Sequence, residues 1–193
     1  MGDFAASKRE ALDTILPQLR ELAAACWLCG HRCGVDRLAG ETGVCCAPSL
    51  SDRYLRYSSY TLHFGEEPPL VGTGGSGTVF FTHCNLSCVF CQNHQISQGG
   101  LGRDASYPEL ALIFRTLQDD GAENVNLVTP THYMYPIALA LREAYAQGLT
   151  RPIVYNTNGY DAPELLALLD GIVDIYLPDM KYMDARHAGS YSN

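Results

Sequence analysis

Short apolar runs alternate with helical segments through the second part of this 193-residue chain, and that alternation limits the folds open to it. The expected strands are residues 78–82, 124–128, 153–155 and 172–177. The expected helices are residues 107–118, 136–147 and 162–169. Strands that are apolar on both faces are typical of a parallel sheet covered by helices, and right-handed β/α crossovers build such a sheet. The sequence therefore predicts an α/β fold with about four parallel strands.

The first expected strand leads directly into a loop with three closely spaced cysteines, Cys84, Cys88 and Cys91. Their C-x3-C-x2-C spacing supplies three thiolates, whereas four would close a zinc or iron–sulfur site. Three protein ligands leave one metal position open to another ligand. A metal centre needs such an open position if it is to take part in a reaction. Ligands of α/β sheets gather beyond the carboxyl ends of the strands, where this loop is expected. The alternative is that the three cysteines are core residues or zinc ligands.

This motif resembles that of radical S-adenosylmethionine (radical SAM) enzymes, in the branch similar to pyruvate formate-lyase activating enzymes. The resemblance implies an incomplete (β/α)6 barrel in which Cys84, Cys88 and Cys91 hold three irons of a 4Fe–4S cluster. The fourth iron would bind the amino and carboxylate groups of SAM, and reduction would release a 5′-deoxyadenosyl radical. Phe90 matches the aromatic or apolar residue that the family places beside the adenine. The cofactors would carry the chemistry, and the protein would bind and orient them.

Two further expected strand ends resemble segments of the same family. Asn156 and Thr157 stand in a run similar to its Asp-Thr-Asn-Gly segment, and Asp179 and Lys181 stand in one similar to its Asp-Leu-Lys segment. The resemblance implies that Thr157 and Asp179 supply oxygen ligands to a monovalent cation and that Lys181 faces the methionine carboxylate. Asn156 replaces an aspartate, so a negative charge is missing and cation binding would be weaker or absent. For Asp179 and Lys181 the alternative is an exposed ion pair.

The end of the second expected strand departs from the family pattern. Residues 129–132 read Thr-Pro-Thr-His where many radical SAM enzymes have a Gly-Gly-Glu-like turn that binds the methionine amino group. Backbone carbonyls, or the hydroxyls of Thr129 and Thr131, would then bind the amine. His132 is either a polar pocket residue or proton donor, or a structural histidine that caps the next helix. Residues 158–159, Asn-Gly, are expected to form a simple turn.

A second cysteine group lies upstream, in a loop-rich segment. Four thiolates occur within twenty residues, at Cys26, Cys29, Cys33 and Cys45. This number suits a closed tetrahedral site, and both zinc and an auxiliary iron–sulfur cluster use four thiolates. Cys46 would be the spare or would replace Cys45, and His31 ranks below the cysteines as a ligand. The alternative is a set of unliganded thiols.

The composition of the chain favours one cellular compartment and argues against some classes of partner. Eight cysteines without an N-terminal secretion signal favour a cytoplasmic protein with bound metal over a secreted disulfide scaffold. No apolar run reaches the roughly 20 residues that a membrane span needs, and the net charge of −8 argues against a nucleic-acid partner. The family resemblance implies an electron donor of the ferredoxin or flavodoxin type, with a protein glycine as one candidate substrate.

Two regions are expected: an N-terminal helix with a cysteine-rich metal-binding segment (1–76), and a radical SAM β/α core (77–193). Helical spacing of apolar residues places the N-terminal helix at 5–25. The core holds about four strands, so truncation at its C-terminus, and hence a fragment of a longer enzyme, is favoured over a naturally short one. We predict a radical SAM oxidoreductase. The alternative is a catalytically silent metal-binding structural or interaction module.

Overall fold

The computed structural model describes residues 2–48 and 54–192. Its helices are α1 (Gly2–Ala24), α2 (Pro68–Val71), α3 (His94–Ser97), α4 (Tyr107–Asp119), the 3-10 turn η1 (Thr131–Tyr133), α5 (Met134–Ala146), α6 (Pro163–Leu168) and α7 (Ala185–Tyr191). Its strands are β1 (Tyr54–His63), β2 (Ser76–Phe81), β3 (Arg103–Ser106), β4 (Val125–Val128), β5 (Ile153–Thr157) and β6 (Ile175–Pro178).

The strands form one sheet in the order β3-β1-β2-β4-β5-β6. The pairs β2–β4, β4–β5 and β5–β6 are parallel, and these four strands are the ones that the apolar runs predicted. The predicted α/β class is therefore confirmed. Within the described part of the chain, β3 and β6 each have a neighbour on one side, so the sheet is open there and closure of a barrel is not shown.

The sheet has six strands rather than about four, because β1 and β3 add antiparallel pairs beside β2. Neither has the continuous apolar run of a strand that is covered on both faces. β1 carries polar residues at most of its positions, and β3 reads Arg-Asp-Ala-Ser. The predicted boundary at residue 76 falls between β1 and β2, which pair with each other along their length. The two-region division stays a prediction.

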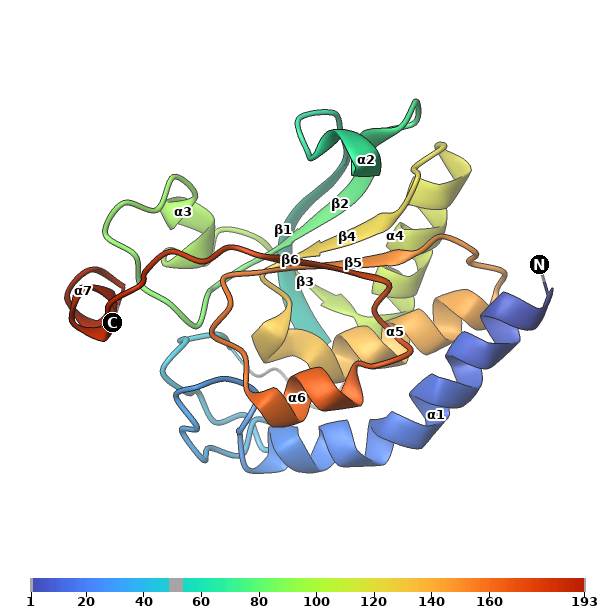
Figure 1. Ribbon diagram of the computed structural model, residues 1–193. Helices are drawn as coiled ribbons and strands as arrows, with labels where there is room; N and C mark the ends of the chain where they lie inside the picture. The colour runs from blue at the N-terminus through green and yellow to red at the C-terminus, as the bar shows by residue number, and fades with distance from the viewer. Residues whose placement is uncertain (1, 49–53, 193) are drawn as a thin grey trace.

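Helices α1, α4, α5 and α6 cover one face of the sheet, whereas α3 and α7 lie beyond the carboxyl ends of the parallel strands (Figure 1). Helix α5 packs against both α1 and α4, which explains why it is apolar on nearly all sides. Buried side chains from α1, α4, α5 and the strands join in one hydrophobic core. The predicted N-terminal helix is confirmed as α1, with Pro17 inside it.

Two non-glycine residues take left-handed backbone angles where parallel strands end. His83 follows β2 with a φ of 64°, and Thr129 follows β4 with a φ of 57°. This conformation costs about 1–3 kcal/mol outside glycine and persists where surrounding contacts impose it. Both residues turn the chain sharply at the carboxyl edge of the sheet. The loops that begin there are the ones in which ligand contacts are expected.

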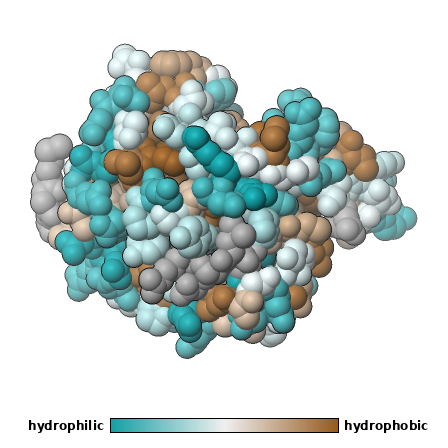
Figure 2. All heavy atoms as spheres, turned by 180° about the vertical axis from the view of Figure 1, so that it is seen from behind, coloured by the Kyte–Doolittle hydropathy of each residue, from teal (hydrophilic) through white to brown (hydrophobic). Residues whose placement is uncertain are grey.

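The surface is mixed in character. Seen from behind, hydrophilic side chains are interspersed with smaller hydrophobic groups (Figure 2). Over residues 2–48 and 54–192, none of the helices is both long enough and apolar enough to cross a membrane.

Candidate functional site

The loop after β2 holds Cys84, Cys88 and Cys91 at the carboxyl edge of the sheet. Its backbone is fixed at several points: His83 N donates to Ile96 O at 3.0 Å, and Cys91 N donates to Cys88 O at 3.1 Å. Cys88 is the most buried of the three, at 7% exposure, and the other two are half-buried. The structure thus brings the predicted cluster ligands together in one anchored loop.

Each of the three sulfur atoms has a polar hydrogen-bond partner. The backbone N–H of Leu86 donates to Cys84 Sγ at 3.4 Å, and Ser192 Oγ donates to Cys88 Sγ at 2.9 Å. Cys91 Sγ and Ser97 Oγ form a hydrogen bond of 3.2 Å. Burial raises the pKa of the Cys84 thiol, and the neighbouring Cys88 and Cys91 raise it further. Hydrogen-bonded sulfurs of this kind fit thiolate ligands, which lose their protons when metal binds.

Among the described residues, no three histidine, cysteine, aspartate or glutamate side chains converge as ligands of a single metal ion. A 4Fe–4S cluster makes a different demand on its ligands. Each cysteine binds a different iron of the cube, so the three sulfurs need not meet at one point. The donor set of the Cys84–Cys91 loop, three thiols on a short anchored loop, therefore fits a cluster with one iron left open.

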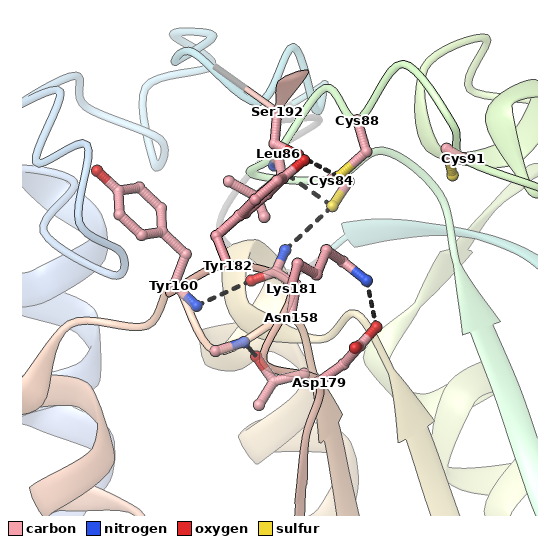
Figure 3. Close-up of polar contacts among 12 residues, drawn as sticks. Cys84, Leu86, Cys88, Cys91, Asn158, Tyr160, Asp179, Lys181, Tyr182 and Ser192 are labelled. Atoms are coloured by element: carbon pink, nitrogen blue, oxygen red, sulfur yellow. Dashed lines mark hydrogen bonds and ion pairs between the residues drawn. The ribbon is translucent and has the colours of Figure 1, made fainter. Parts of the chain in front are cut away.

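A cavity of about 510 Å³ opens beside this loop. Its walls come from the cluster loop, the ends of β5 and β6, and α7, through Leu86, Asn158, Tyr160, Lys181 and Ala188 among others (Figure 3). Its position at the carboxyl edge of the parallel strands is that of ligand sites in open α/β sheets. A volume in this range is typical of pockets for small molecules.

Phe90, predicted to lie beside an adenine, is 55% exposed and packs against Tyr182 with their ring centroids 6.2 Å apart. Tyr182 is a wall of the cavity. Phe90 is therefore separated from the cavity by one aromatic ring, and its contact with an adenine stays a prediction.

The four residues predicted around a cation and the methionine carboxylate occupy adjacent strand ends. Asp179 N donates to Thr157 O at 2.8 Å, and Thr129 N donates to Asn156 O at 2.9 Å. Lys181 lines the cavity and forms an ion pair with Asp179. The Asp179 side chain is 61% exposed, so this pair contributes little to stability. Their roles toward SAM and a cation stay predictions.

Asp161 is the residue at this edge that the sequence did not single out. Its carboxylate accepts three hydroxyl hydrogen bonds: from Thr131 at 2.7 Å, from Tyr155 at 2.8 Å and from Thr157 at 2.5 Å. Burial raises the pKa of Tyr155 well above its usual range, with the Asp161 charge adding to this. The Thr157 hydroxyl, predicted to bind a cation, here donates to Asp161. The sequence offered one indication of this role, because Asp161 is a carboxylate only four residues after Thr157.

A comparison with protein families identifies the family of this chain. The model of the radical SAM superfamily matches residues 78–188, which include the cluster loop, the parallel strands and both later strand ends. The chain belongs to the radical SAM superfamily. Membership implies an enzyme of radical chemistry with a 4Fe–4S cluster and SAM. The three cysteines of the cluster loop lie within the matched residues, and their role as the cluster ligands stays a prediction.

One curated relative matches the chain over most of its length. The chain is 36% identical over 192 residues to "Uncharacterized protein MJ0674" from Methanocaldococcus jannaschii, an alignment that covers 94% of this chain and 52% of the relative. The chain thus spans about half the length of the curated relative that it matches. No solved structure matches the chain.

The upstream cysteines lie in the loop after α1. Cys26 and Cys29 are buried, Cys33 and Cys45 are half-buried, and Cys46 is exposed. Burial raises the pKa of Cys26 to about 12. The guanidinium of Arg37, a residue only 5% exposed, donates from Nη1 to Cys45 Sγ at 3.6 Å. Cys26 and Cys29 therefore lie in a buried environment, and Cys45 lies beside a buried positive charge.

The upstream loop packs directly on the cluster loop, which holds Cys84, Cys88 and Cys91. His31 Nε2 donates to Asn85 O at 2.7 Å, and its ring meets that of Tyr160 edge-on at 5.0 Å between centroids. Gly30 N donates to Tyr160 O at 3.1 Å, and Cys29 forms an isolated β-bridge with Asp161. His31 thus joins the upstream loop to the cluster loop through its Nε2 hydrogen bond to Asn85 O.

His132 is a structural histidine of the radical SAM core. It is 4% exposed, and its Nε2 donates to Thr82 O at 2.8 Å, which ties the end of β2 to the turn after β4. Burial, and secondarily the charge of Arg37, lowers the pKa of His132 to about 3. A buried neutral imidazole with this contact fits the structural alternative better than a proton donor.

This histidine gives a prediction on acid stability. The unfolded chain binds a proton at His132 below about pH 6.5, whereas the folded chain resists it down to about pH 3. Its stabilising contribution is therefore complete above pH 6.5 and is lost as the pH falls through this window, by at most about 1.4 kcal/mol per pH unit. Urea unfolding at pH 7 and pH 5 measures this. A His132→Gln variant should lose less stability between the two pH values than the parent, and an equal loss would contradict the assignment.

Proposed function

We propose that this chain reductively cleaves SAM in the cavity beside the cluster loop and uses the product to abstract a hydrogen atom from a substrate. The observation that supports this most is that the three-cysteine loop contributes Leu86 to the wall of a cavity of about 510 Å³, which also takes in Asn158, the hydrogen-bond partner of Cys84 Sγ. When bound, the reduced cluster supplies one electron to the sulfonium of SAM, and the C–S bond breaks to give methionine and a 5′-deoxyadenosyl radical.

The residues of the chain have the tasks of binding, orienting and shielding. Cys84, Cys88 and Cys91 would hold the cluster. Lys181, on the cavity wall, offers an ammonium group to the methionine carboxylate, and Phe90 supports the adenine side. The apolar and aromatic walls exclude water, which protects a radical from side reactions.

The partners follow from the electron balance. Each cleavage consumes one electron, so a donor of the ferredoxin or flavodoxin type is needed. We further propose that the chain resembles the pyruvate formate-lyase activating branch and that a protein glycine is one candidate substrate. A monovalent cation near Asp179 is part of the same proposal, with Asn156 in place of the family's aspartate weakening it.

The test is anaerobic reconstitution with iron and sulfide, reduction with dithionite, and quantification of 5′-deoxyadenosine after addition of SAM. The proposal expects about four irons at this site, as in a cubane cluster, and reductive formation of 5′-deoxyadenosine. Bound metal without any SAM cleavage would instead support the alternative of a catalytically silent metal-binding module.

We also propose that the upstream cysteines bind a second metal centre, either zinc or an iron–sulfur cluster. Four thiols belong to one loop, although among the described residues no three of them converge on one point, so metal binding would draw them together. The buried guanidinium of Arg37 contacts Cys45 and complements the negative charge of a thiolate site. A metal there would stabilise a loop-rich segment with little core of its own.

A triple variant with alanine at Cys84, Cys88 and Cys91 isolates the upstream centre. This variant should retain about one zinc per chain, or the visible absorption of a cluster, and additional replacement of Cys26 and Cys29 should remove it. Elemental analysis and absorption spectra of the purified proteins distinguish zinc from iron. A triple variant that is free of both metals would overturn the proposal.

A further inference from the structure

The side chain of Asn158 makes three polar contacts at the centre of the candidate site. Its Nδ2 donates to Cys84 Sγ at 3.3 Å and to Asn85 Oδ1 at 2.7 Å, and its Oδ1 accepts from Tyr160 N at 2.9 Å. Figure 3 shows this amide directly beside the Cys84 sulfur. The orientation of the amide is fixed, because the Tyr160 N–H requires an acceptor and Asn85 Oδ1 requires a donor.

Asparagine suits this position because one group must donate and accept at the same time. The side chain starts from the turn after β5, where Gly159 has a φ of 78°. Asn85, the partner of Asn158, donates in turn to Tyr160 O at 3.1 Å. The two amides therefore join the cluster loop to the end of β5, across more than seventy residues of sequence.

The contact has a consequence for the sulfur. Cys84 Sγ receives two N–H donors, from Leu86 and from Asn158, whereas Cys88 Sγ and Cys91 Sγ form hydrogen bonds with the hydroxyls of Ser192 and Ser97. Hydrogen bonds to cluster sulfurs are among the factors that set the reduction potential of iron–sulfur clusters. An N–H donor stabilises the more negative, reduced state and so raises the potential.

We propose that Asn158 is a positioning residue that holds Cys84 in place and raises the reduction potential of the cluster bound there. The inference rests on the proposed function, because it assumes that Cys84 is a cluster ligand. Asn158 also lines the cavity, so one side chain contacts both the Cys84 sulfur and the space that a small molecule would occupy.

The test is a redox titration of the reconstituted cluster, followed by electron paramagnetic resonance, in the parent and in Asn158→Ala and Asn158→Asp. Alanine removes the donor. Aspartate keeps an acceptor for Tyr160 N, removes the donor and adds a negative charge. At a fixed solution potential, we expect the ratio of reduced to oxidised cluster to fall about tenfold in Asn158→Ala, which corresponds to about 59 mV for one electron. In Asn158→Asp this ratio should fall by at least the same factor.

The matched control is Asn93→Ala, because Asn93 is an exposed asparagine of the same loop whose side chain forms no cap hydrogen bond. It should keep the parent potential. Loss of cluster uptake in both Asn158 variants but not in Asn93→Ala would support the positioning role. Variants that keep both the cluster and the parent potential would overturn the proposal. The titration does not depend on SAM cleavage. If the Asn158 variants lower the reduction potential as expected but the parent does not cleave SAM, the proposed function is refuted and the role of Asn158 stands.

Discussion

Replacement of Cys88 by alanine is expected to abolish the formation of 5′-deoxyadenosine by the reduced, reconstituted protein. A loss of at least about 100-fold is expected, because even changes outside the ligands of a metal site cost about 10–100-fold. Cys88 is the most buried of the three cysteines and lies between the backbone contacts that anchor the loop. Two remaining thiolates hold a cluster poorly, so the iron content of the site should fall together with the activity.

Cys46→Ala provides the matched control for this experiment. Cys46 is an exposed cysteine whose thiol donates to Val44 O at 3.6 Å, outside the cluster loop. The control carries the same chemical change, and it should keep the parent's iron content in that loop and its yield of 5′-deoxyadenosine. Equal iron uptake and equal product in Cys88→Ala and Cys46→Ala would refute the assignment of Cys88 as a ligand.

The sequence predicted the parallel half of the sheet well, because β2, β4 and β5 are buried at most of their positions. Val79, Leu127 and Tyr155 are fully buried, and runs of such residues are visible without any knowledge of the partners. β1 and β3 pair at the side of the sheet and carry polar residues, so their strand character depends on neighbours far away in the sequence.

The cysteines of the site were predictable for a similar reason. Their spacing lies within eight residues, from Cys84 to Cys91, and the chemistry of three thiolates is local information. Asn158 and Asp161 act through contacts that only the fold creates. The expected role of the Asn-Gly pair was a turn, and a turn is present there, but the side chain of Asn158 reaches a sulfur 74 residues away.

The two cysteine loops also meet in a way that spacing does not reveal. Asn85 follows the first cluster cysteine and accepts from His31 of the upstream loop, while Tyr160 contacts both. A metal in the upstream loop would therefore stiffen a wall of the radical SAM site. The proposed upstream centre would then act on the site by fixing positions rather than by contacting the cavity.

Replacement of Asp161 by alanine is expected to lower the free energy of unfolding by about 2–4 kcal/mol. The carboxylate accepts hydroxyl groups from Thr131, Tyr155 and Thr157, all of which are at most 5% exposed. Without it, these buried donors lose their main acceptor, and water reaches them poorly. The loss is limited because Tyr155 also donates to Thr131 at 3.3 Å. Urea unfolding monitored by circular dichroism measures the difference.

Two further variants make this prediction specific. Asp161→Asn keeps one acceptor oxygen and the same shape, so it should cost less than the alanine variant, about 1 kcal/mol. Asp179→Ala removes a carboxylate from the neighbouring strand end, but that side chain is exposed and its ion pair is worth less than about 1 kcal/mol. If Asp161→Ala were no more destabilising than Asp179→Ala, the hydroxyl cluster would not organise this edge of the sheet. A graded series would show that the ends of β4 and β5, which position the candidate site, are held by one carboxylate.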